Sequence, residues 1–422
     1  MSNIGHARQV PNFEKVSVPQ KGEANTANAK RTSCPFDANR DERKSARLAA
    51  RYVKAEPGVE LIGKFGVARE ILRSLKVKQA GAGAEHVDVG NPEHVPVFYL
   101  DGESHKRRRA AIAKLFTPNA IKARYRGVME RTTDDLLARL KASGRARLDE
   151  VTFELAVSVA SEIVGLTKSD PRKMAPRIAA LLASSFSNAG GLRRLVNKAK
   201  QAWYGRQFYV KDVRPAVRER REQRREDLIS QTLDKGYSDR AIMVECMTYA
   251  TAGMVTTREF IVMVAWYMFD RAEIRERFLA ADEERQIAIL QEILRLEPIA
   301  GLLYRRVDED LDTTSLGQAR AGAQFAIDLR AVNSDESAVG ACPHMLDPDR
   351  AQRQNENGTF MSFGDGPHRC PGWQVALRET RVFIDRLLRV PGIRLEREPD
   401  MRWNAMLMSY ELRNAIVACD RA

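Results

Sequence analysis

The fold of this chain is decided by ten residues, Phe363-Gly364-Asp365-Gly366-Pro367-His368-Arg369-Cys370-Pro371-Gly372. They place one cysteine on a glycine-containing loop directly ahead of an apolar, helix-like segment. A thiolate that binds a metal must be deprotonated, and backbone N–H groups at a helix start favour that state. The three glycines are expected to let the backbone close tightly around the sulfur. The pattern Phe-x-x-Gly-x-x-x-Cys-x-Gly would arise by chance in roughly one chain in a thousand, so it predicts a metal-binding cysteine.

This loop resembles the heme-binding loop of the cytochrome P450 family, in which a cysteine holds the heme iron. The resemblance implies that Cys370 is the proximal ligand of heme b (iron protoporphyrin IX), surrounded by Phe363, Gly364, His368 and Gly372. Thiolate ligation favours cleavage of the O–O bond. The implied fold is mainly α with small β-sheets (α+β), a single domain with the heme between a long oxygen-side helix and the cysteine-loop helix. Taken alone, the loop is also compatible with a buried structural cysteine.

A second motif lies about 75 residues before the cysteine, where Glu292 and Arg295 are one helical turn apart and precede Pro298. An i,i+3 ion pair on a helix surface is common and contributes a few tenths of a kcal/mol. Its place in the chain matches the family, in which such a pair holds the core behind the cysteine loop. The resemblance therefore implies a structural role for Glu292 and Arg295.

The third motif lies in a long, apolar helical segment from about Ser238 to Asp270. The resemblance implies that Ala252, Gly253 and Thr256 cross the oxygen-binding face of the heme, with Thr256 bonding back to a carbonyl and loosening the helix. The family usually has an acidic residue just before this threonine, whereas this chain has Val255. Glu259 could replace the missing acid or face solvent. A buried core helix with a tolerated glycine is the alternative.

Basic residues are expected at the heme propionates. His105 and Arg109 share one face of a predicted helix that opens at His105, and guanidinium groups bind carboxylates bidentately. The resemblance implies that His105, Arg109, Arg305 and His368 contact the propionates, with Arg306 as a register alternative to Arg305. For any one of them alone, a solvated charge is the more common situation.

The candidate substrate contacts are apolar residues near these motifs, and flexible methionines could fit an irregular ligand. The region around Gly190-Gly191 is a candidate lid, although a surface loop explains it equally well. The candidate contacts are Met254, Val255, Ile299, Leu302, Leu303, Met406 and Leu407.

Charge bears on the partners of the chain. The formal net charge is +13, but the basic runs interleave acidic residues and no nucleic-acid-binding motif is present, so we expect no nucleic-acid partner. Basic residues on the face behind the cysteine could instead meet an acidic ferredoxin or flavodoxin-type donor, which works with its own reductase. Those residues are Lys114, Arg369, Arg378 and Arg381.

Domain organisation and location follow from the rest of the sequence. The motifs predict one catalytic domain over residues 44–422 and a polar, flexible tail over residues 1–43 that has no apolar anchor. Five scattered cysteines give no disulfide pattern and fit a reducing compartment, so we expect a cytoplasmic protein without a membrane partner. Cys34 and Cys342 also precede proline, but neither has the glycine context of Cys370.

The expected elements begin at about Ala46 with a strand at Val59–Ile62 and a helix over 67–72. A loop follows at Gly81–Ala84, then mostly helix over 118–275 with a break at Gly190-Gly191. Short strands are expected between Arg305 and Ile327, and a hairpin over Asn404–Ile416.

The sequence thus predicts a heme-thiolate monooxygenase that inserts one atom of dioxygen into a small, largely apolar molecule, using electrons from a separate partner. The enzyme is expected to serve specialised metabolism. Loss of the acid at Val255 leaves oxidative coupling, ring closure or a peroxide-driven reaction as alternatives. A non-catalytic heme protein that senses a ligand is the alternative from another class, and retention of Thr256 weighs against it.

Overall fold

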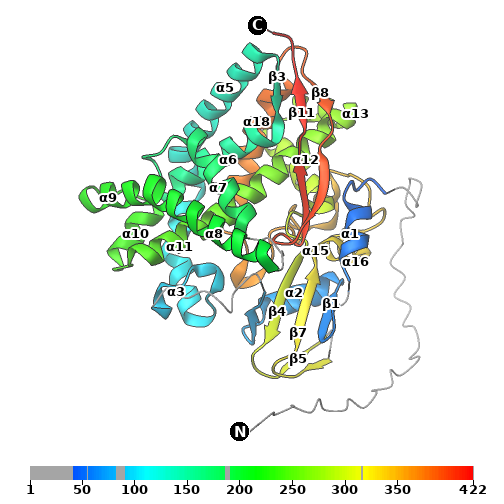
Figure 1. Ribbon diagram of the computed structural model, residues 1–422. Helices are drawn as coiled ribbons and strands as arrows, with labels where there is room; N and C mark the ends of the chain where they lie inside the picture. The colour runs from blue at the N-terminus through cyan, green and yellow to red at the C-terminus, as the bar shows by residue number, and fades with distance from the viewer. Residues whose placement is uncertain (1–40, 55, 82–90, 186–190, 315–316, 422) are drawn as a thin grey trace.

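A computed structural model describes residues 41–54, 56–81, 91–185, 191–314 and 317–421. Over these residues the fold is mainly helical with four small sheets, as predicted, and in Figure 1 the helical part lies beside the sheet that contains β1, β4 and β7. The α-helices are α1 (Ala46–Tyr52), α2 (Phe65–Arg73), α3 (Gly102–Ala113), α4 (Pro118–Ala120), α5 (Arg126–Ser143), α6 (Leu148–Val164), α7 (Pro171–Ser185), α8 (Gly191–Phe208), α9 (Arg214–Glu222), α10 (Leu228–Asp234), α11 (Asp239–Tyr249), α12 (Thr256–Asp270), α13 (Ala272–Ala280), α14 (Glu283–Leu296), α15 (Leu329–Val332), α16 (Glu336–Val339), α17 (Arg350–Gln354) and α18 (Trp373–Leu388).

Short helices of other types connect these elements. In the described part of the chain three are π-helical turns, which often occur at functional sites: η5 (Ile121–Tyr125), η6 (Tyr209–Val213) and η7 (Ala250–Val255). The 3₁₀ turns are η2 (Pro92–His94), η3 (Val97–Tyr99), η4 (Lys114–Phe116) and η8 (Gly366–His368). Because η7 joins α11 directly to α12, the predicted long segment from Ser238 to Asp270 is one continuous helical rod, with Ser238 capping its start through a bond from Ala241 N–H.

The largest sheet has the strand order β1 (Val59–Ile62), β7 (Gln324–Asp328), β4 (Leu302–Val307) and β2 (Val77–Gln79). β1 pairs in parallel with β7, and β4 runs antiparallel to both β7 and β2. The register of β2 and β4 sets Gln79 of the edge strand β2 opposite Arg305, a candidate cofactor residue on the inner strand β4.

Three smaller sheets are present among the described residues. β9 (Asp400–Asn404) and β10 (Ser409–Arg413) form a hairpin, and β5 (Leu311–Thr313) pairs with β6 (Gly317–Ala319). β11 (Ile416–Ala418) lies between β3 (Arg145–Arg147) and β8 (Arg394–Arg397).

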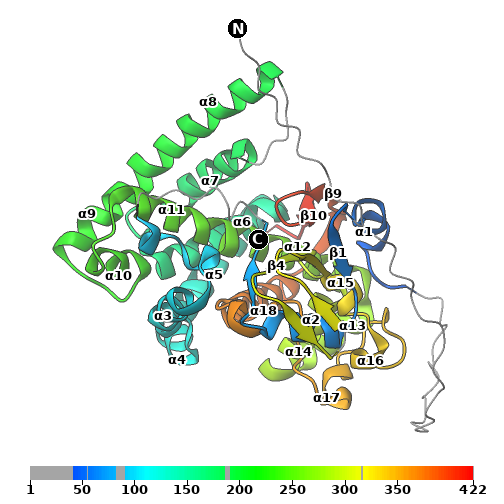
Figure 2. The same ribbon diagram turned by 90° about the horizontal axis from the view of Figure 1, so that it is seen from below.

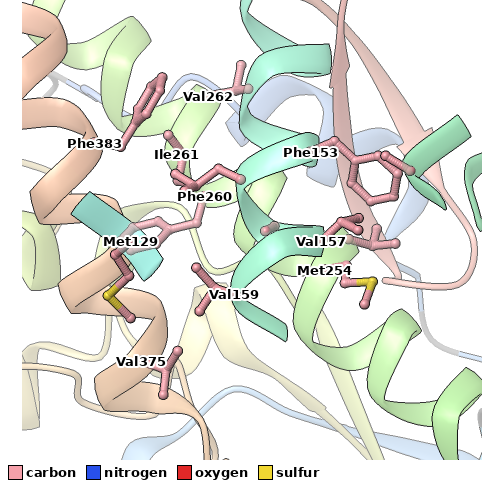
Figure 3. Close-up of a cluster of buried hydrophobic side chains, with 14 of the residues drawn as sticks. Met129, Phe153, Val157, Val159, Met254, Phe260, Ile261, Val262, Val375 and Phe383 are labelled. Carbon is pink, nitrogen blue, oxygen red and sulfur yellow. The ribbon is translucent and has the colours of Figure 1, made fainter. Parts of the chain in front are cut away.

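The main core lies between α5, α6, α12 and α18. Figure 3 shows Met129, Phe260 and Phe383 on one side of α6, and Phe153 and Met254 on the other. A second, smaller core under the largest sheet packs Phe65 and Ile71 of α2 against Phe325 and other residues of that sheet. The two cores border the segments that carry the predicted site.

Most predicted elements are present, with corrections at several boundaries. The α3 helix begins at Gly102 rather than at His105, and the C-terminal hairpin spans 400–413, because Ile416 belongs to β11 instead. Glu42, assigned to the tail, is buried and its backbone N–H bonds to the His344 carbonyl at 3.1 Å. The predicted loop at 81–84 and the break at Gly190-Gly191 lie partly outside the described residues.

Cysteine chemistry also differs from the expectation, because Cys342 is disulfide-bonded. No pattern of cysteine spacing had indicated a disulfide.

Within the described part of the chain, no helix is long and apolar enough to cross a membrane.

Candidate active site

The cysteine loop is a tight turn that requires two of its glycines. Gly364 and Gly366 have φ of +70° and +65°, a region that favours glycine. A Cβ on Gly366 would also lie 2.1 Å from the Leu72 carbonyl oxygen of α2, so this position tolerates no side chain. Gly372 has an ordinary φ of −86°, which corrects the expectation that it too is needed for backbone closure.

Cys370 lies at the end of this turn, just before α18. Its N–H bonds to the Phe363 carbonyl at 2.9 Å, which closes the loop. Burial raises the pKa of the Cys370 thiol, whereas the N–H groups of Gly372 and Trp373 and the charge of Arg109 act to lower it. A metal cation would offset the cost of burying a thiolate, so these donors fit a metal-bound sulfur.

The other described cysteines lack such surroundings. Cys246 and Cys419 are buried in the main core, and burial raises the pKa of the Cys246 thiol. The Cys342 sulfur is committed to its disulfide. Cys370 therefore remains the candidate ligand among them.

Two of the predicted basic residues lie side by side. The rings of His105 on α3 and His368 on η8 are 4.1 Å apart between centroids. Burial, together with the nearby His368 and Arg109, lowers the pKa of His105 to about 4, so this imidazole is neutral at pH 7. His368 Nε2 is 3.0 Å from the Asp101 carboxylate.

Arg305 and Arg109 complete the group. Arg305 is 5% exposed, and burial lowers its pKa to about 10, with Asp101 acting in the opposite direction. This places Arg305 rather than Arg306 with the histidines. Arg109 bonds to the Arg369 carbonyl of the cysteine loop. Among the described residues neither arginine has an ion-pair partner, and two such guanidinium groups fit the two propionates of a heme.

Asp101 is a site residue that the sequence analysis missed. Its carboxylate accepts hydrogen bonds from the Gln79 N–H at 3.2 Å and interacts with His368 and Arg305. Burial acts to raise the pKa of Asp101, but these partners outweigh it and hold the pKa below its usual value. An aspartate at the residue before α3, four positions ahead of His105, was the available signal.

The oxygen-side helix has the predicted irregularity. The η7 turn is π-helical, and Thr256 Oγ1 donates a 2.6 Å hydrogen bond to the Ala252 carbonyl. Ala252 is exposed and Thr256 half-buried, so both face an open side of the helix. Gly253 turns toward α6, where a Cβ on it would lie 3.9 Å from that of Ala160. The predicted back-bond of Thr256 is thus confirmed.

The neighbouring residues face the core. Met254 is fully buried and Val255 is 3% exposed, and Figure 3 shows Met254 beside Val157 of α6. Neither side chain is directed to the open side that Thr256 shares, so the structure gives no support for the expectation that they contact substrate. An acidic side chain at position 255 would also be buried among apolar side chains, which disfavours its charged form.

Glu259 does not replace the missing acid, which corrects that alternative. Its carboxylate is fully buried and accepts bonds from Arg258, from Arg413 at 2.7 Å and from the Leu412 N–H at 2.7 Å. These contacts bind α12 to β10. Glu259 therefore has a structural role, because its carboxylate is already bonded within α12 and to β10.

The remaining substrate candidates converge where β4 meets the β9–β10 hairpin. The Gly301 N–H bonds to the Leu407 carbonyl at 3.0 Å, so the segment from Ile299 to Leu303 lies against the hairpin turn that carries Met406. Leu303 also approaches the cysteine loop, because its Cδ1 would lie 3.7 Å from a Cβ on Gly364. Ile299, Leu302 and Leu407 are buried, whereas Leu303 and Met406 are half-buried.

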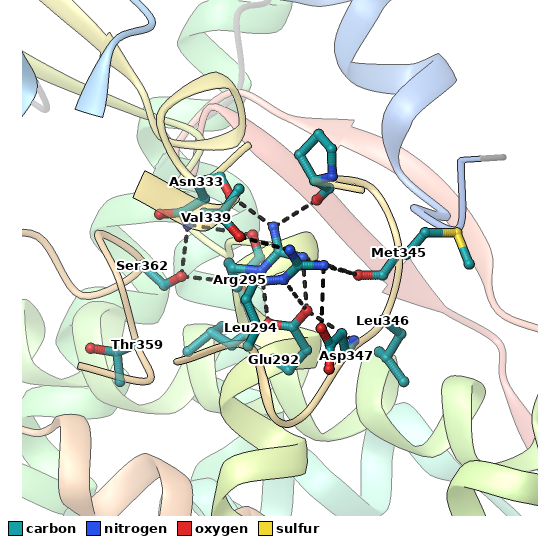
Figure 4. Close-up of polar contacts among 12 residues, drawn as sticks. Glu292, Leu294, Arg295, Asn333, Val339, Met345, Leu346, Asp347, Thr359 and Ser362 are labelled. Atoms are coloured by element: carbon teal, nitrogen blue, oxygen red, sulfur yellow. Dashed lines mark hydrogen bonds and ion pairs between the residues drawn. The ribbon is translucent and has the colours of Figure 1, made fainter. Parts of the chain in front are cut away.

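Behind the cysteine loop, Glu292 and Arg295 form a buried ion pair with two bonds of 2.8 Å (Figure 4). Arg295 also donates to the carbonyls of Asn333, Pro343 and Met345. Arg350, which the sequence analysis missed, donates at 3.0 Å to Glu292 Oε1, the oxygen that also accepts a bond from Arg295 Nη2.

This network reaches the cysteine loop through Asn333. The Asn333 side chain accepts the Met361 N–H and donates to Ser362 Oγ, and each of these bonds is 2.9 Å. Ser362 directly precedes Phe363, the carbonyl of which holds the Cys370 N–H. The predicted pair therefore supports the segment that carries the cysteine.

Comparisons with known proteins agree with this site. A family model described as "Cytochrome P450" matches residues 287–399. Nocardicin C N-oxygenase from Nocardia uniformis subsp. tsuyamanensis is 26% identical, covering 81% of this chain and 84% of that protein. Mycinamicin IV hydroxylase/epoxidase from Micromonospora griseorubida is also 26% identical, covering 75% and 78%.

Solved structures share the fold. Mycobacterium smegmatis CYP164A2 in its ligand-free state has a TM-score of 0.68 at 25% identity, with 88% of this chain and 94% of that chain covered. CYP109E1 from Bacillus megaterium in complex with corticosterone has a TM-score of 0.70 at 20% identity, covering 88% and 97%. The motif order, the fold and these relatives agree, and the chain belongs to the cytochrome P450 family of heme b monooxygenases.

Proposed function

We propose that this enzyme inserts one oxygen atom from dioxygen into a small, largely apolar molecule of specialised metabolism, with residues 44–422 as its catalytic domain. The observation that carries the proposal is the bond from Thr256 to the Ala252 carbonyl on the open side of η7. The same rod approaches the cysteine, because Tyr249, one residue before η7, interacts electrostatically with Cys370.

The roles of the residues follow from their chemistry. When bound, the heme supplies the iron at which dioxygen is activated. Cys370 would hold that iron, and His105, Arg109, Arg305 and His368 would bind the propionates. Thr256 Oγ1 donates its hydrogen bond to the Ala252 carbonyl, which leaves the lone pairs of this oxygen free to accept a hydrogen bond from water. That water would deliver the proton which Val255 cannot donate.

The substrate class is inferred from the apolar side chains between β4 and the hairpin, of which Leu303 approaches the cysteine loop. Leu303 and Met406 are half-buried and lie with Ile299 and Leu407 where β4 meets the hairpin. Apolar side chains of this kind favour an apolar ligand. By their names, two relatives act on nocardicin C and mycinamicin IV, which supports a specialised metabolite as the substrate.

Electron delivery is assigned to the basic surface beside α18. A hollow of about 290 Å³, named here the basic hollow, carries Lys122, Arg126, Arg378 and Arg381 and one acid, Glu283, which pairs with the last two. The excess of positive charge favours an acidic ferredoxin or flavodoxin-type donor. Its lining residues are Pro118, Ile121, Lys122, Arg126, Met129, Glu283, Arg378, Arg381 and Val382.

The test combines a binding screen with labelled turnover. The purified holoenzyme is titrated with a library of small apolar molecules, and hits displace the iron-bound water in the absorption spectrum. Hits are then incubated with ferredoxin, its reductase, NADPH and oxygen-18 gas. A product that carries one oxygen-18 atom supports the proposal. A product that has lost two hydrogens without gaining oxygen would indicate coupling or ring closure, and turnover with peroxide alone would indicate the peroxide-driven alternative.

The donor assignment has its own matched test. Lys122→Glu is expected to slow reduction by an acidic ferredoxin, and the effect should fade as salt is added. Lys198→Glu on α8, which is also exposed but lies away from the basic hollow, is the control and should behave as the unmodified enzyme. Equal rates for both variants would contradict the docking site.

A further inference from the structure

Two adjacent arginines of α3 bind on opposite sides of the site. Arg109 bonds to the Arg369 carbonyl of the cysteine loop. Arg108 instead donates to Glu245 Oε1 on α11 at 2.8 Å, and the two side chains are only 4% and 1% exposed. Figures 1 and 2 both show α3 beside α11. A buried ion pair therefore joins α3 to the rod that continues into η7.

Several polar atoms at this ion pair lack hydrogen-bond partners. Arg108 Nε, Glu245 Oε2 and the Tyr249 hydroxyl are all buried without a hydrogen-bond partner. Burial raises the pKa of Glu245, with Arg108 acting to lower it. Arg108 also stacks over the Tyr237 ring at 4.7 Å. Buried ion pairs with unsatisfied atoms add little net stability, so stability alone is a poor explanation for this one.

The location of the pair relates it to the cofactor contacts. Tyr249, one helical turn after Glu245, interacts electrostatically with both Arg109 and Cys370. The Tyr249 ring lies 6.5 Å from the Phe116 ring, and Phe116 lies 3.8 Å from where a Cβ on Gly372 would be. The end of α11 and the end of α3 thus meet at the cysteine loop, and a shift of α3 against α11 would move Arg109.

We propose that the Arg108–Glu245 pair positions Arg109 and His105 for the heme propionates by fixing α3 against α11. Arg108 and Glu245 are positioning residues in this proposal, since they act through Arg109 and His105. The inference rests on the proposed propionate role of Arg109. It predicts that the effect of losing Arg108 depends on whether Arg109 is present.

A double-mutant cycle tests this dependence. The rate of heme loss from the full-length holoprotein to excess apomyoglobin is measured for the unmodified protein, Arg108→Met, Arg109→Met and the double variant. Arg108→Met is expected to accelerate heme loss about 10- to 100-fold, as for other groups that orient cofactor contacts. In the Arg109→Met background the same change should alter the rate by less than about threefold.

Each other outcome has a definite meaning. If Arg109→Met loses heme at the unmodified rate, the propionate role of Arg109 fails and the positioning role fails with it. Suppose that Arg109→Met accelerates heme loss. If Arg108→Met then has no effect on heme loss, or has the same effect whether or not Arg109 is present, only the positioning role is overturned. If Arg108→Met does not fold, Glu245→Gln, which keeps an acceptor for Arg108, takes its place in the cycle.

A second buried ion pair controls for general destabilisation. Arg220 and Asp227 are paired, with side chains 1% and 4% exposed, and they join α9 to the start of α10 away from the cofactor residues. Arg220→Met should lower the urea midpoint as Arg108→Met does, yet leave the rate of heme loss unchanged. Acceleration by both variants to the same extent would show that heme loss follows stability, and would overturn the positioning role.

Discussion

Replacing Glu292 by Gln should destabilise the protein severely. Glu292 accepts both bonds from Arg295, one from Arg350 Nε at 3.0 Å and one from the Asp347 N–H at 3.0 Å. The two guanidinium groups are 0% and 2% exposed, so the variant leaves two buried cations without an anion. Removing one partner of a buried pair costs about 3–5 kcal/mol, a large part of the roughly 5–15 kcal/mol that stabilises a domain.

The assay is urea unfolding followed by circular dichroism, together with the fraction of purified protein that retains heme. Heme retention should also fall, because Arg295 binds the Asn333 carbonyl and the Asn333 side chain holds the segment before the cysteine loop. Glu130→Gln is the control. It breaks the exposed pair with Arg126 at 2.9 Å and should cost about 0.3–0.5 kcal/mol. A loss for Glu292→Gln as small as that of the control would refute the reasoning.

Four further outcomes are expected. Cys370→Ser should abolish the red-shifted Soret band of the reduced, carbon-monoxide-bound protein while Cys246→Ser keeps it; the reverse result would refute the ligand assignment. Thr256→Ala should consume reductant and release peroxide with little product, so unchanged coupling would exclude Thr256 from proton delivery. Val255→Asp should lower the free energy of unfolding by about 2 kcal/mol or more, because it buries a carboxyl group among apolar side chains. For the heme-free protein, His105 has a folded-state pKa of about 4 against 6.5 unfolded; the unfolded chain then binds the proton first, and stability should fall from pH 6.5 toward pH 4 by at most about 1.4 kcal/mol per pH unit. His105→Gln should remove that part of the slope in urea midpoints, and an unchanged slope would contradict the assignment.

Local motifs were enough to predict the cysteine loop and the Glu292–Arg295 pair. The residues of each motif are close in sequence. Glycine at positions 364 and 366 indicates a backbone with positive φ, which the structure has at both. The helical rod from Ser238 to Asp270 was also predictable, because a capping serine and a continuous apolar pattern mark its extent.

The faces of that rod were not predictable. A π-helical turn adds a residue to the ring of each hydrogen bond, so helical spacing cannot fix which side chains share a face across it. Met254 and Val255 consequently turn to the core while Ala252 faces the open side. The structural roles of Glu259 and Arg350 were not predictable for another reason. Their partners Arg413 and Glu292 lie 154 and 58 residues away, and no local pattern shows such contacts.

The pairing of β11 with β3 has a consequence for how the protein is made. Val417 pairs with Ala146, and the Ala415 carbonyl accepts the Leu148 N–H at the start of α6. The turn between α5 and α6 therefore stays without its partners until residues 415–418 have left the ribosome. Contacts of such long sequence separation form slowly, and until they form the chain exposes apolar surface. Yield of folded protein during overproduction should accordingly rise at lower temperature or with added chaperones.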